Sequence, residues 1–126
     1  MNKLFFGIIA LLLLATSCTK DQLIKQLKGT YKVNSYIKDN KDETNSFKAE
    51  KQDYRLEIQE SNTFIESYNL NGQVYQQTTG QWQLINSNKD LQLVDASNNV
   101  RMFNIKAIAD KTMTLTKGNE EYKFIE

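Results

Sequence analysis

A period of two in hydrophobicity constrains this chain more than any other feature of its sequence. Residues 54–59 alternate strictly between apolar and polar side chains. On an extended chain successive side chains point to opposite sides, so Tyr54, Leu56 and Ile58 share one face and the charged residues share the other. The alternation predicts a β-strand that is buried on one side.

Eight further runs of this kind are separated by short segments rich in Asn, Gly, Ser and Asp. The runs cover residues 31–37, 63–68, 73–78, 81–85, 91–94, 100–108, 112–116 and 121–125. Asn71-Gly72 in particular suits the positive φ angles of a tight hairpin turn. Because a parallel return needs a crossover of a dozen or more residues, and none is available after residue 53, neighbouring strands should be antiparallel.

About eight short strands in sequence order form either a closed barrel or a two-sheet sandwich. Closure removes exposed sheet edges, which favours the barrel. The chain contains no proline, so no strand position lacks an N–H donor. We therefore expect an all-β fold, an antiparallel up-and-down meander barrel, as the single domain of residues 23–126.

The segment before the first strand predicts one short helix. Asp21 can cap it, Leu23, Ile24 and Leu27 fall on one side, and Gly29 can leave it in a left-handed conformation. We expect this helix to close one end of the barrel. Residues 38–52 are polar and predict a long loop, either a functional lid or a solvated connection, with a short strand around residues 46–49 as an alternative.

Alternation also predicts which side chains fill the barrel. The inward set is Tyr31, Val33, Ile37, Tyr54, Leu56, Ile58, Phe64, Trp82, Leu84, Leu91, Leu93, Phe103, Ile105, Met113, Leu115, Tyr122 and Phe124. An eight-stranded interior is either filled by side chains or holds one small molecule. Because so many of these residues are aromatic, and each aromatic buries about 150–250 Å², we expect a nearly filled core rather than a large cavity.

Several single residues allow two interpretations. Trp82 is either a core anchor, which we favour, or a platform on which a ligand stacks. The hydroxyls of Tyr54, Tyr75 and Tyr122 either point into a pocket or sit at the solvated rim. Glu66 follows the alternation of the inward residues, but we expect it at a solvated strand end.

The start of the chain carries a targeting signal. An apolar stretch after Lys3 ends in Leu14-Ala15-Thr16-Ser17-Cys18, which resembles the lipobox of bacterial lipoproteins. As a helix, at about 1.5 Å per residue, the stretch would reach only about 18 Å, short of the roughly 30 Å hydrocarbon core of a bilayer. We therefore do not expect an uncleaved transmembrane helix.

The resemblance implies that residues 1–17 are a lipoprotein signal peptide, that Cys18 carries the lipid, and that residues 18–22 form a tether. Lipidation would also explain why an exported chain has a single cysteine. Residues 19–21 resemble the charged segment that directs some lipoproteins of Gram-negative bacteria to the outer surface. They imply an anchor in the outer membrane.

Charge and composition exclude several functions. The chain has 16 basic and 15 acidic residues, and loss of Lys3 with the signal peptide leaves the mature domain neutral. No basic stripe for nucleic acid is present. The chain has no histidine and no metal-ligand or nucleophile motif. We therefore expect no enzyme activity, no metal and no cofactor.

The remaining motifs carry a family resemblance. Residues 27–33, which open the first strand with Gly29-Thr30-Tyr31, resemble the Gly-x-Trp opening of lipocalins, with Tyr31 in place of the tryptophan. Residues 79–84 around Trp82 and residues 112–115 are similar to the lipocalin-like domains of small bacterial lipoproteins. In that family a basic side chain covers the opening tryptophan, and either Arg101 or Lys123 would take that part here.

The resemblance implies a lipid-anchored binding module for a small apolar ligand. Its candidate cavity or core residues are Tyr31, Tyr54, Leu56, Phe64, Trp82, Phe103 and Tyr122. An alternative function remains open, in which the barrel is a rigid platform whose loops bind another envelope protein or a macromolecule.

Overall fold

The computed structural model of the chain describes residues 20–126, so the predictions for residues 1–17 and Cys18 lie outside it. A helix that includes residues 20–27 precedes the first strand. The elements that follow are β1 (Gly29–Lys38), β2 (Lys41–Asp42), α2 (Thr44–Glu50), β3 (Lys51–Ile58), β4 (Thr63–Leu70), β5 (Val74–Ile85), β6 (Asp90–Asp95), β7 (Val100–Ala109), β8 (Thr112–Lys117) and β9 (Glu120–Ile125). No helix among the described residues has the length and apolar character needed to cross a membrane.

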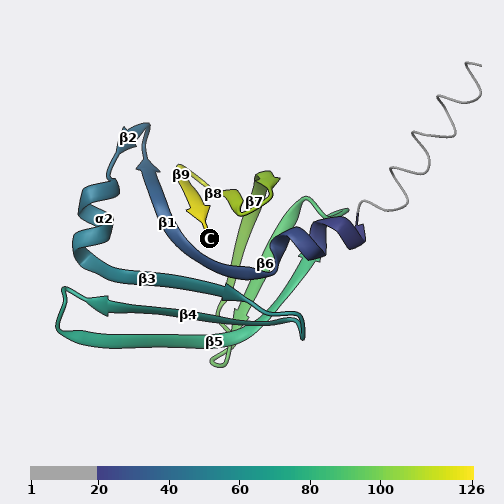
Figure 1. The fold of residues 1–126 in the computed structure, drawn as a ribbon, viewed down its shortest axis with the longest axis horizontal. Helices are drawn as coiled ribbons and strands as arrows, with labels where there is room; N and C mark the ends of the chain where they lie inside the picture. The colour runs from purple at the N-terminus through teal and green to yellow at the C-terminus, as the bar shows by residue number, and fades with distance from the viewer. Residues whose placement is uncertain (1–19) are drawn as a thin grey trace, which may run out of the picture.

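Eight strands close into an antiparallel barrel (Figure 1). Strands β3 to β9 pair in sequence order, and β1 closes the ring by pairing with both β3 and β9. The register places Tyr31 opposite Leu56 on one side of β1 and Val33 opposite Phe124 on the other. β2 is a two-residue addition to the edge of β1. The predicted up-and-down barrel is confirmed.

The predicted turn residues have the backbone conformations that tight turns require. Asn71 and Gly72 both have positive φ, and the Gln73 amide donates to the Leu70 carbonyl across them at 3.0 Å. Asn62 and Asn98 also adopt positive φ between strands. Asparagine tolerates this region better than most residues, which explains its frequency at the strand connections.

β5 corrects one predicted boundary. Residues 73–78 and 81–85 were expected as two strands, whereas β5 runs without a break from Val74 to Ile85. Gly80, in the expected gap, is paired with Phe64 of β4 and Asp95 of β6. Ladder pairing on both sides keeps the glycine extended, and the absence of a side chain lets the two neighbouring strands approach closely.

The N-terminal helix lies at one end of the barrel (Figure 1). Leu23 and Leu27 are buried in the core cluster. Two details differ from prediction: Asp21 lies inside the helix rather than at its cap, and Gly29 begins β1 with a φ of 155° instead of ending the helix in a left-handed turn. The helix carbonyls are bound instead by a strand residue, because the Tyr31 hydroxyl lies 2.8 Å from the Gln26 oxygen and 2.9 Å from the Leu27 oxygen.

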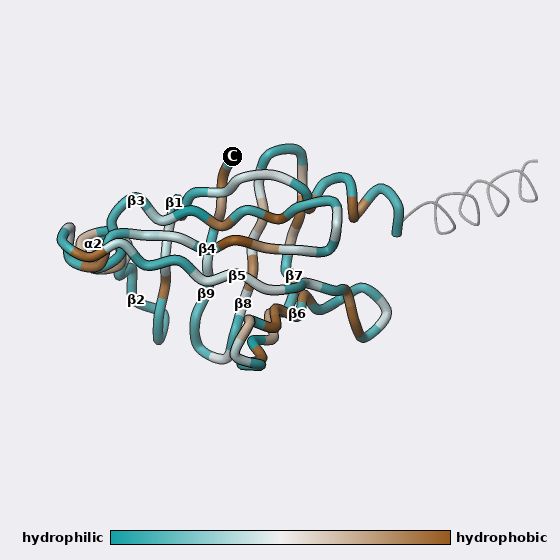
Figure 2. Tube along the Cα trace, turned by 90° about the horizontal axis from the view of Figure 1, so that it is seen from below, coloured by the Kyte–Doolittle hydropathy of each residue, from teal (hydrophilic) through white to brown (hydrophobic). Residues whose placement is uncertain are grey.

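The buried residues are hydrophobic except for Glu66. Along the chain, hydrophilic residues predominate in the turns, whereas hydrophobic residues lie within the strands (Figure 2). Most of the predicted inward set is buried, and Tyr54, Leu84, Ile105 and Tyr122 are partly buried and pack against it. Ile37 was predicted to face inward, but Tyr36 is the buried residue. The reason is a register shift between Val33 and Ser35, which moves the alternation of faces by one residue.

Residues 38–52 are not the predicted loop. They form β2 and the seven-residue α2, and the alternative strand at residues 46–49 is also wrong. The Asp42 carboxylate, just before α2, accepts a hydrogen bond from the Thr44 amide at 3.0 Å. A helix this short is not stable alone in water. Burial of Phe47 against the barrel, together with a hydrogen bond from the Tyr36 amide to the Thr44 hydroxyl at 3.0 Å, holds α2 in place.

Candidate functional site

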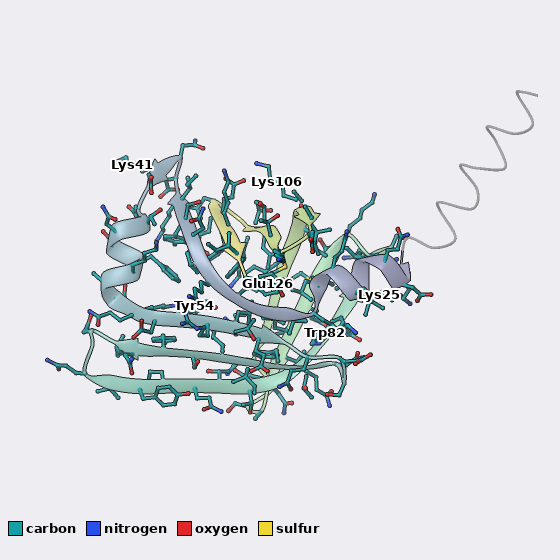
Figure 3. All side chains as sticks on the ribbon, in the orientation of Figure 1. Lys25, Lys41, Tyr54, Trp82, Lys106 and Glu126 are labelled. Atoms are coloured by element: carbon teal, nitrogen blue, oxygen red, sulfur yellow. The ribbon has the colours of Figure 1, made fainter. Side chains whose placement is uncertain are left out.

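Seven aromatic rings fill the half of the barrel that α2 covers. We call them the aromatic cluster: Tyr36, Phe47, Tyr54, Tyr68, Phe103, Tyr122 and Phe124. Their ring centroids form a connected network at separations of 4.9–6.4 Å. Phe47 comes from α2 and the other rings from five strands, so the cluster joins the helix to the barrel wall. Figure 3 shows Tyr54 in this half and Trp82 toward the N-terminal helix.

Glu66 brings a charge into this apolar interior. The residue is 8% exposed, which corrects the expectation of a solvated strand end. Arg101 donates to its carboxylate at 3.0 Å, and the Tyr54 hydroxyl donates to the same oxygen. Burial and the nearby carboxylate raise the pKa of Tyr54 well above its usual value. Burial alone would lower the pKa of Arg101, but the hydrogen bond and charge of Glu66 raise it. The pair is neutral, as a buried charge requires.

Lys51 is a second cation that contacts the aromatic cluster. It is the first residue of β3, and its ammonium lies 5.4 Å from the Phe47 ring centroid and 5.2 Å from that of Tyr68. Both distances are within the range of cation–π attraction. Among residues 20–126 the salt bridges are Lys28–Glu60, Glu66–Arg101 and Lys106–Glu121, so Lys51 has no carboxylate partner there.

The enclosed interior is almost full, as predicted. A cavity of about 30 Å³, the inner cavity, lies among Lys51, Tyr54, Glu66, Arg101 and the surrounding aromatic and leucine side chains. It has room for a water molecule or two, whereas pockets that bind small molecules measure about 300–1,000 Å³. The barrel in this conformation therefore has no room for a ligand in its interior.

A larger space opens through the barrel wall. β1 and β3 pair only from Gly29 to Tyr31, and beyond that point the two strands separate. The space between them, which we call the β1–β3 cleft, measures about 400 Å³. Its lining is Lys32, Val33, Phe47, Lys48, Lys51, Gln52, Asp53, Tyr54 and Arg55. Phe47, Lys51 and Tyr54 line both the cleft and the inner cavity, so these three side chains separate the two spaces.

Two further hollows lie at the other end of the barrel and are larger but wider open. One, of about 840 Å³, runs along Lys28–Thr30 and the chain from Glu57 to Ser61, where Lys28 and Glu60 already form a salt bridge at 3.1 Å. The second, of about 550 Å³, lies over Gly80 and the end of β6. Neither contacts the aromatic cluster or an unpaired cation, so the cleft is the stronger candidate.

The structure divides the predicted site residues into two groups. Tyr31, Leu56, Phe64, Trp82 and Phe103 are buried members of the core. Trp82 is 3% exposed, and its indole N–H donates to the Gln59 carbonyl at 2.8 Å, which is the arrangement of a core anchor. Tyr54 and Tyr122 are only partly buried, and they line the inner cavity together with Leu56 and Phe103 of the first group. Tyr75, whose hydroxyl was a candidate for a pocket, is 62% exposed on β5.

The predicted basic cover over Tyr31 takes a different form. Arg101 is bound to Glu66, and Lys123 is exposed on β9. The Tyr31 hydroxyl instead binds the carbonyls at the end of the N-terminal helix. Burial and, secondly, the charge of Glu126 raise the pKa of Tyr31. A hydroxyl, which an indole lacks, thus ties the helix to the barrel.

Sequence reasoning missed Phe47, Lys51 and the role of Arg101. Phe47 is an isolated apolar residue in a polar segment, and only its burial of 92% marks it as structural. Lys51 breaks the alternation because of a bulge in β3. The partners Glu66 and Arg101 are 35 residues apart. Within residues 20–126, no group of histidine, cysteine, aspartate or glutamate side chains is arranged to hold a metal ion.

Comparison with known proteins supports the fold. No family model and no curated protein sequence matches this chain. A crystal structure of a lipocalin-like protein from Bacteroides uniformis matches with a TM-score of 0.64 and 11% identity over 80% of this chain and 98% of that one. A crystal structure of an uncharacterized protein from Bacteroides eggerthii matches with a TM-score of 0.61 and 15% identity. The match covers 79% of this chain and 98% of that one. At these identities the likeness concerns the fold alone: the chain folds as a lipocalin-like barrel.

Proposed function

We propose that this protein is a non-catalytic binding module for a small, largely apolar ligand, held at the cell envelope by lipid on Cys18. The observation that carries the proposal is the β1–β3 cleft of about 400 Å³, which ends on the aromatic cluster. Its volume is in the range of small-molecule sites. Val33, Phe47 and Tyr54 form the apolar part of its lining, against which the ligand would pack.

Phe47 gives the site a way to enlarge. Its ring lies between the cleft and the inner cavity, and it is the one buried side chain of α2. The helix is otherwise tied to its surroundings at its two ends, where the Tyr36 amide donates to the Thr44 hydroxyl at 3.0 Å and the Asn71 amide to the Glu50 carbonyl at 2.8 Å. A short helix with a single buried side chain belongs to the least stable part of a fold. Outward movement of Phe47 would join the two spaces and expose further rings of the aromatic cluster to the ligand.

Fluorescence titration with N-phenyl-1-naphthylamine, an uncharged naphthalene probe, tests this proposal. Residues 20–126 are suitable for the experiment because they contain all eight strands and the whole core cluster. We expect saturable binding by the wild-type domain and tighter binding by Phe47→Ala, which opens the inner cavity. Tyr75→Ala, which removes an exposed ring that does not line the cleft, is the matched control and should bind like the wild type. Absence of binding in both the wild type and Phe47→Ala would overturn the proposal.

One observation favours the alternative, a platform for protein interaction. β5 pairs with β4 from Val74 to Gln81 but with β6 only from Gly80 to Ile85, so residues 74–78 have a free edge among the described residues. Val74 is 53% and Tyr75 62% exposed there, and the segment carries no charge. Such edges accept a further strand from another chain.

Site-specific photo-crosslinking in cells that make the protein tests the alternative. A crosslinker at position 77 on the free edge should give one defined adduct, and the same group at Lys123 on β9 is the control. Tyr75→Lys, which places a charge on the edge, should abolish the adduct. Equal adducts at both positions, or an adduct unaffected by Tyr75→Lys, would contradict an edge-binding partner.

A further inference from the structure

The side chains of the β1–β3 cleft are strongly unbalanced in charge. Four cations line it, Lys32, Lys48, Lys51 and Arg55, against the single carboxylate of Asp53. None of the four takes part in a salt bridge within residues 20–126. The described part of the mature domain is close to neutral overall. A local excess of positive charge in a hollow attracts and concentrates anions.

Lys51 is the cation placed best to act on a bound molecule. It lines both the cleft and the inner cavity, and its ammonium is held against the rings of Phe47 and Tyr68. The residue is half-buried, so its ammonium has lost part of its hydration without gaining a carboxylate. An anion delivered by a ligand would supply the missing counter-charge.

A strained backbone brings Lys51 to this position. The register between β3 and β4 shifts between Gln52 and Arg55, and Asp53 has a φ of 55°, in the left-handed region. In a regular strand Gln52, two residues before Tyr54, would share the inner face. The extra residue of the bulge turns Lys51 inward instead. A non-glycine residue in the left-handed region is uncommon within a strand, and here it marks the bulge.

We propose that the ligand of the β1–β3 cleft is a small amphipathic anion, whose apolar body lies against Phe47 and Tyr54 and whose carboxylate or sulfonate binds Lys51. This inference rests on the proposed binding function and specifies its ligand class. Entry is from the side of the barrel, between β1 and β3. Lys32, Lys48 and Arg55 attract the anion, and Lys51 binds it where the cleft meets the inner cavity.

Two probes that differ only in charge test the inference. 1-Anilinonaphthalene-8-sulfonate has the same rings as N-phenyl-1-naphthylamine and adds one sulfonate. Both are titrated against residues 20–126, after circular dichroism and a melting curve have established that each variant is folded. We expect the wild type to bind the sulfonate about tenfold more tightly than the neutral probe, which is typical of one charge-assisted hydrogen bond.

Lys51→Gln removes the charge and keeps a polar side chain of similar length. We expect it to lose about tenfold in affinity for the sulfonate and little for the neutral probe. Lys123→Gln, the same change on the exposed face of β9, is the matched control and should leave both affinities unchanged. Addition of 0.5 M NaCl should weaken sulfonate binding and spare the neutral probe.

The outcomes separate the two proposals. If the neutral probe binds and Lys51→Gln leaves sulfonate affinity unchanged, the anion inference is overturned while the binding function stands. Equal loss with Lys123→Gln also overturns the inference, because the effect would then be one of net charge. If neither probe binds, the proposed function fails and the inference fails with it.

Discussion

At the scale of single residues, the barrel interior contains two kinds of groups. Its apolar side chains could be predicted from the alternation, whereas the buried carboxylate of Glu66 could not. Glu66 occupies an inward position in the same alternation as Phe64. Its carboxylate stays in the interior because Arg101 and Tyr54 both donate to it. The cost of burying a carboxylate makes such partners necessary. Here, a charged residue at an inward-facing strand position indicates a hydrogen-bonded network inside the barrel rather than the end of a strand.

Leu56→Asp should unfold the domain. Leu56 is 2% exposed on the inner face of β3 and pairs with Glu66 of β4, so the new carboxylate would lie beside the one that already binds Arg101. Burial of an unpaired charge is among the few changes that destabilise by more than about 4 kcal/mol. Thermal melting followed by circular dichroism measures the effect. Gln81→Asp, an exposed strand position, is the control, and a normal melting curve for Leu56→Asp would show that the assigned faces are reversed.

The buried tyrosines should make the fold sensitive to alkali. Burial, with the hydrogen bond to Glu120, raises the pKa of Tyr36 to about 12, and burial also raises the pKa values of Tyr31, Tyr54 and Tyr122. In the unfolded chain these phenols lose their protons near pH 10. The folded state then holds more protons than the unfolded state, so the free energy of unfolding falls as the pH rises from about 10 to about 12.

Urea unfolding at pH 8 and pH 11 measures this loss. Tyr122→Phe removes one of the four phenols and should show a smaller decrease between the two pH values than the wild type. A free energy of unfolding that is the same at pH 8 and pH 11 would contradict the expected burial of these hydroxyls.

At the scale of elements, bulges and glycines decide how the strands are placed. A register shift in β1 places Tyr36 rather than Ile37 in the core. A second shift, in β3, turns Lys51 rather than Gln52 toward the inner face at the β1–β3 cleft. Each shift adds one residue to a strand and reverses the faces beyond it. Sequence alternation identifies the faces on either side of a bulge, but the position of the bulge depends on the partner strand.

Gly80→Ala should strain the centre of β5. A Cβ at this position would lie 2.0 Å from the Val94 carbonyl oxygen and 2.7 Å from the Phe64 ring. Because the first contact is with backbone, the two strands must separate, at a cost of about 3 kcal/mol. Gly118→Ala is the control: its Cβ would meet open space, and only the left-handed φ of 59° costs about 1 kcal/mol. Urea denaturation compares the two, and equal stability losses would contradict the close approach.

At the scale of the whole molecule, the barrel closes through one strand. β1 pairs with β3 over three residues and with β9 over most of its length, and its departure from β3 creates the cleft. Closure buries the apolar faces of eight strands, while the gap between β1 and β3 remains and is bridged by α2. The site is therefore a property of the closed barrel and not of any single strand.

Cys18→Ala should release the protein from the membrane without unfolding the barrel. All members of the core cluster lie at Leu23 or beyond, so the substitution removes only the site of the proposed lipid. Phase separation in Triton X-114 measures the anchor: the wild type should enter the detergent phase and the variant the aqueous phase, with equal melting temperatures for the two folded domains. Recovery of Cys18→Ala in the detergent phase would contradict the lipid anchor.

The sequence by itself determined the strand faces and the turns, because hydrophobic alternation and the tolerance of Asn and Gly for positive φ are local properties. It therefore predicted the antiparallel barrel and most of its core, from Tyr31 to Phe124. Only the tertiary structure decided that residues 44–50 are helical, that Glu66 meets Arg101, and that the open space lies between β1 and β3. Each of these depends on contacts between separate segments of the chain, and a local sequence pattern does not predict which segments come into contact.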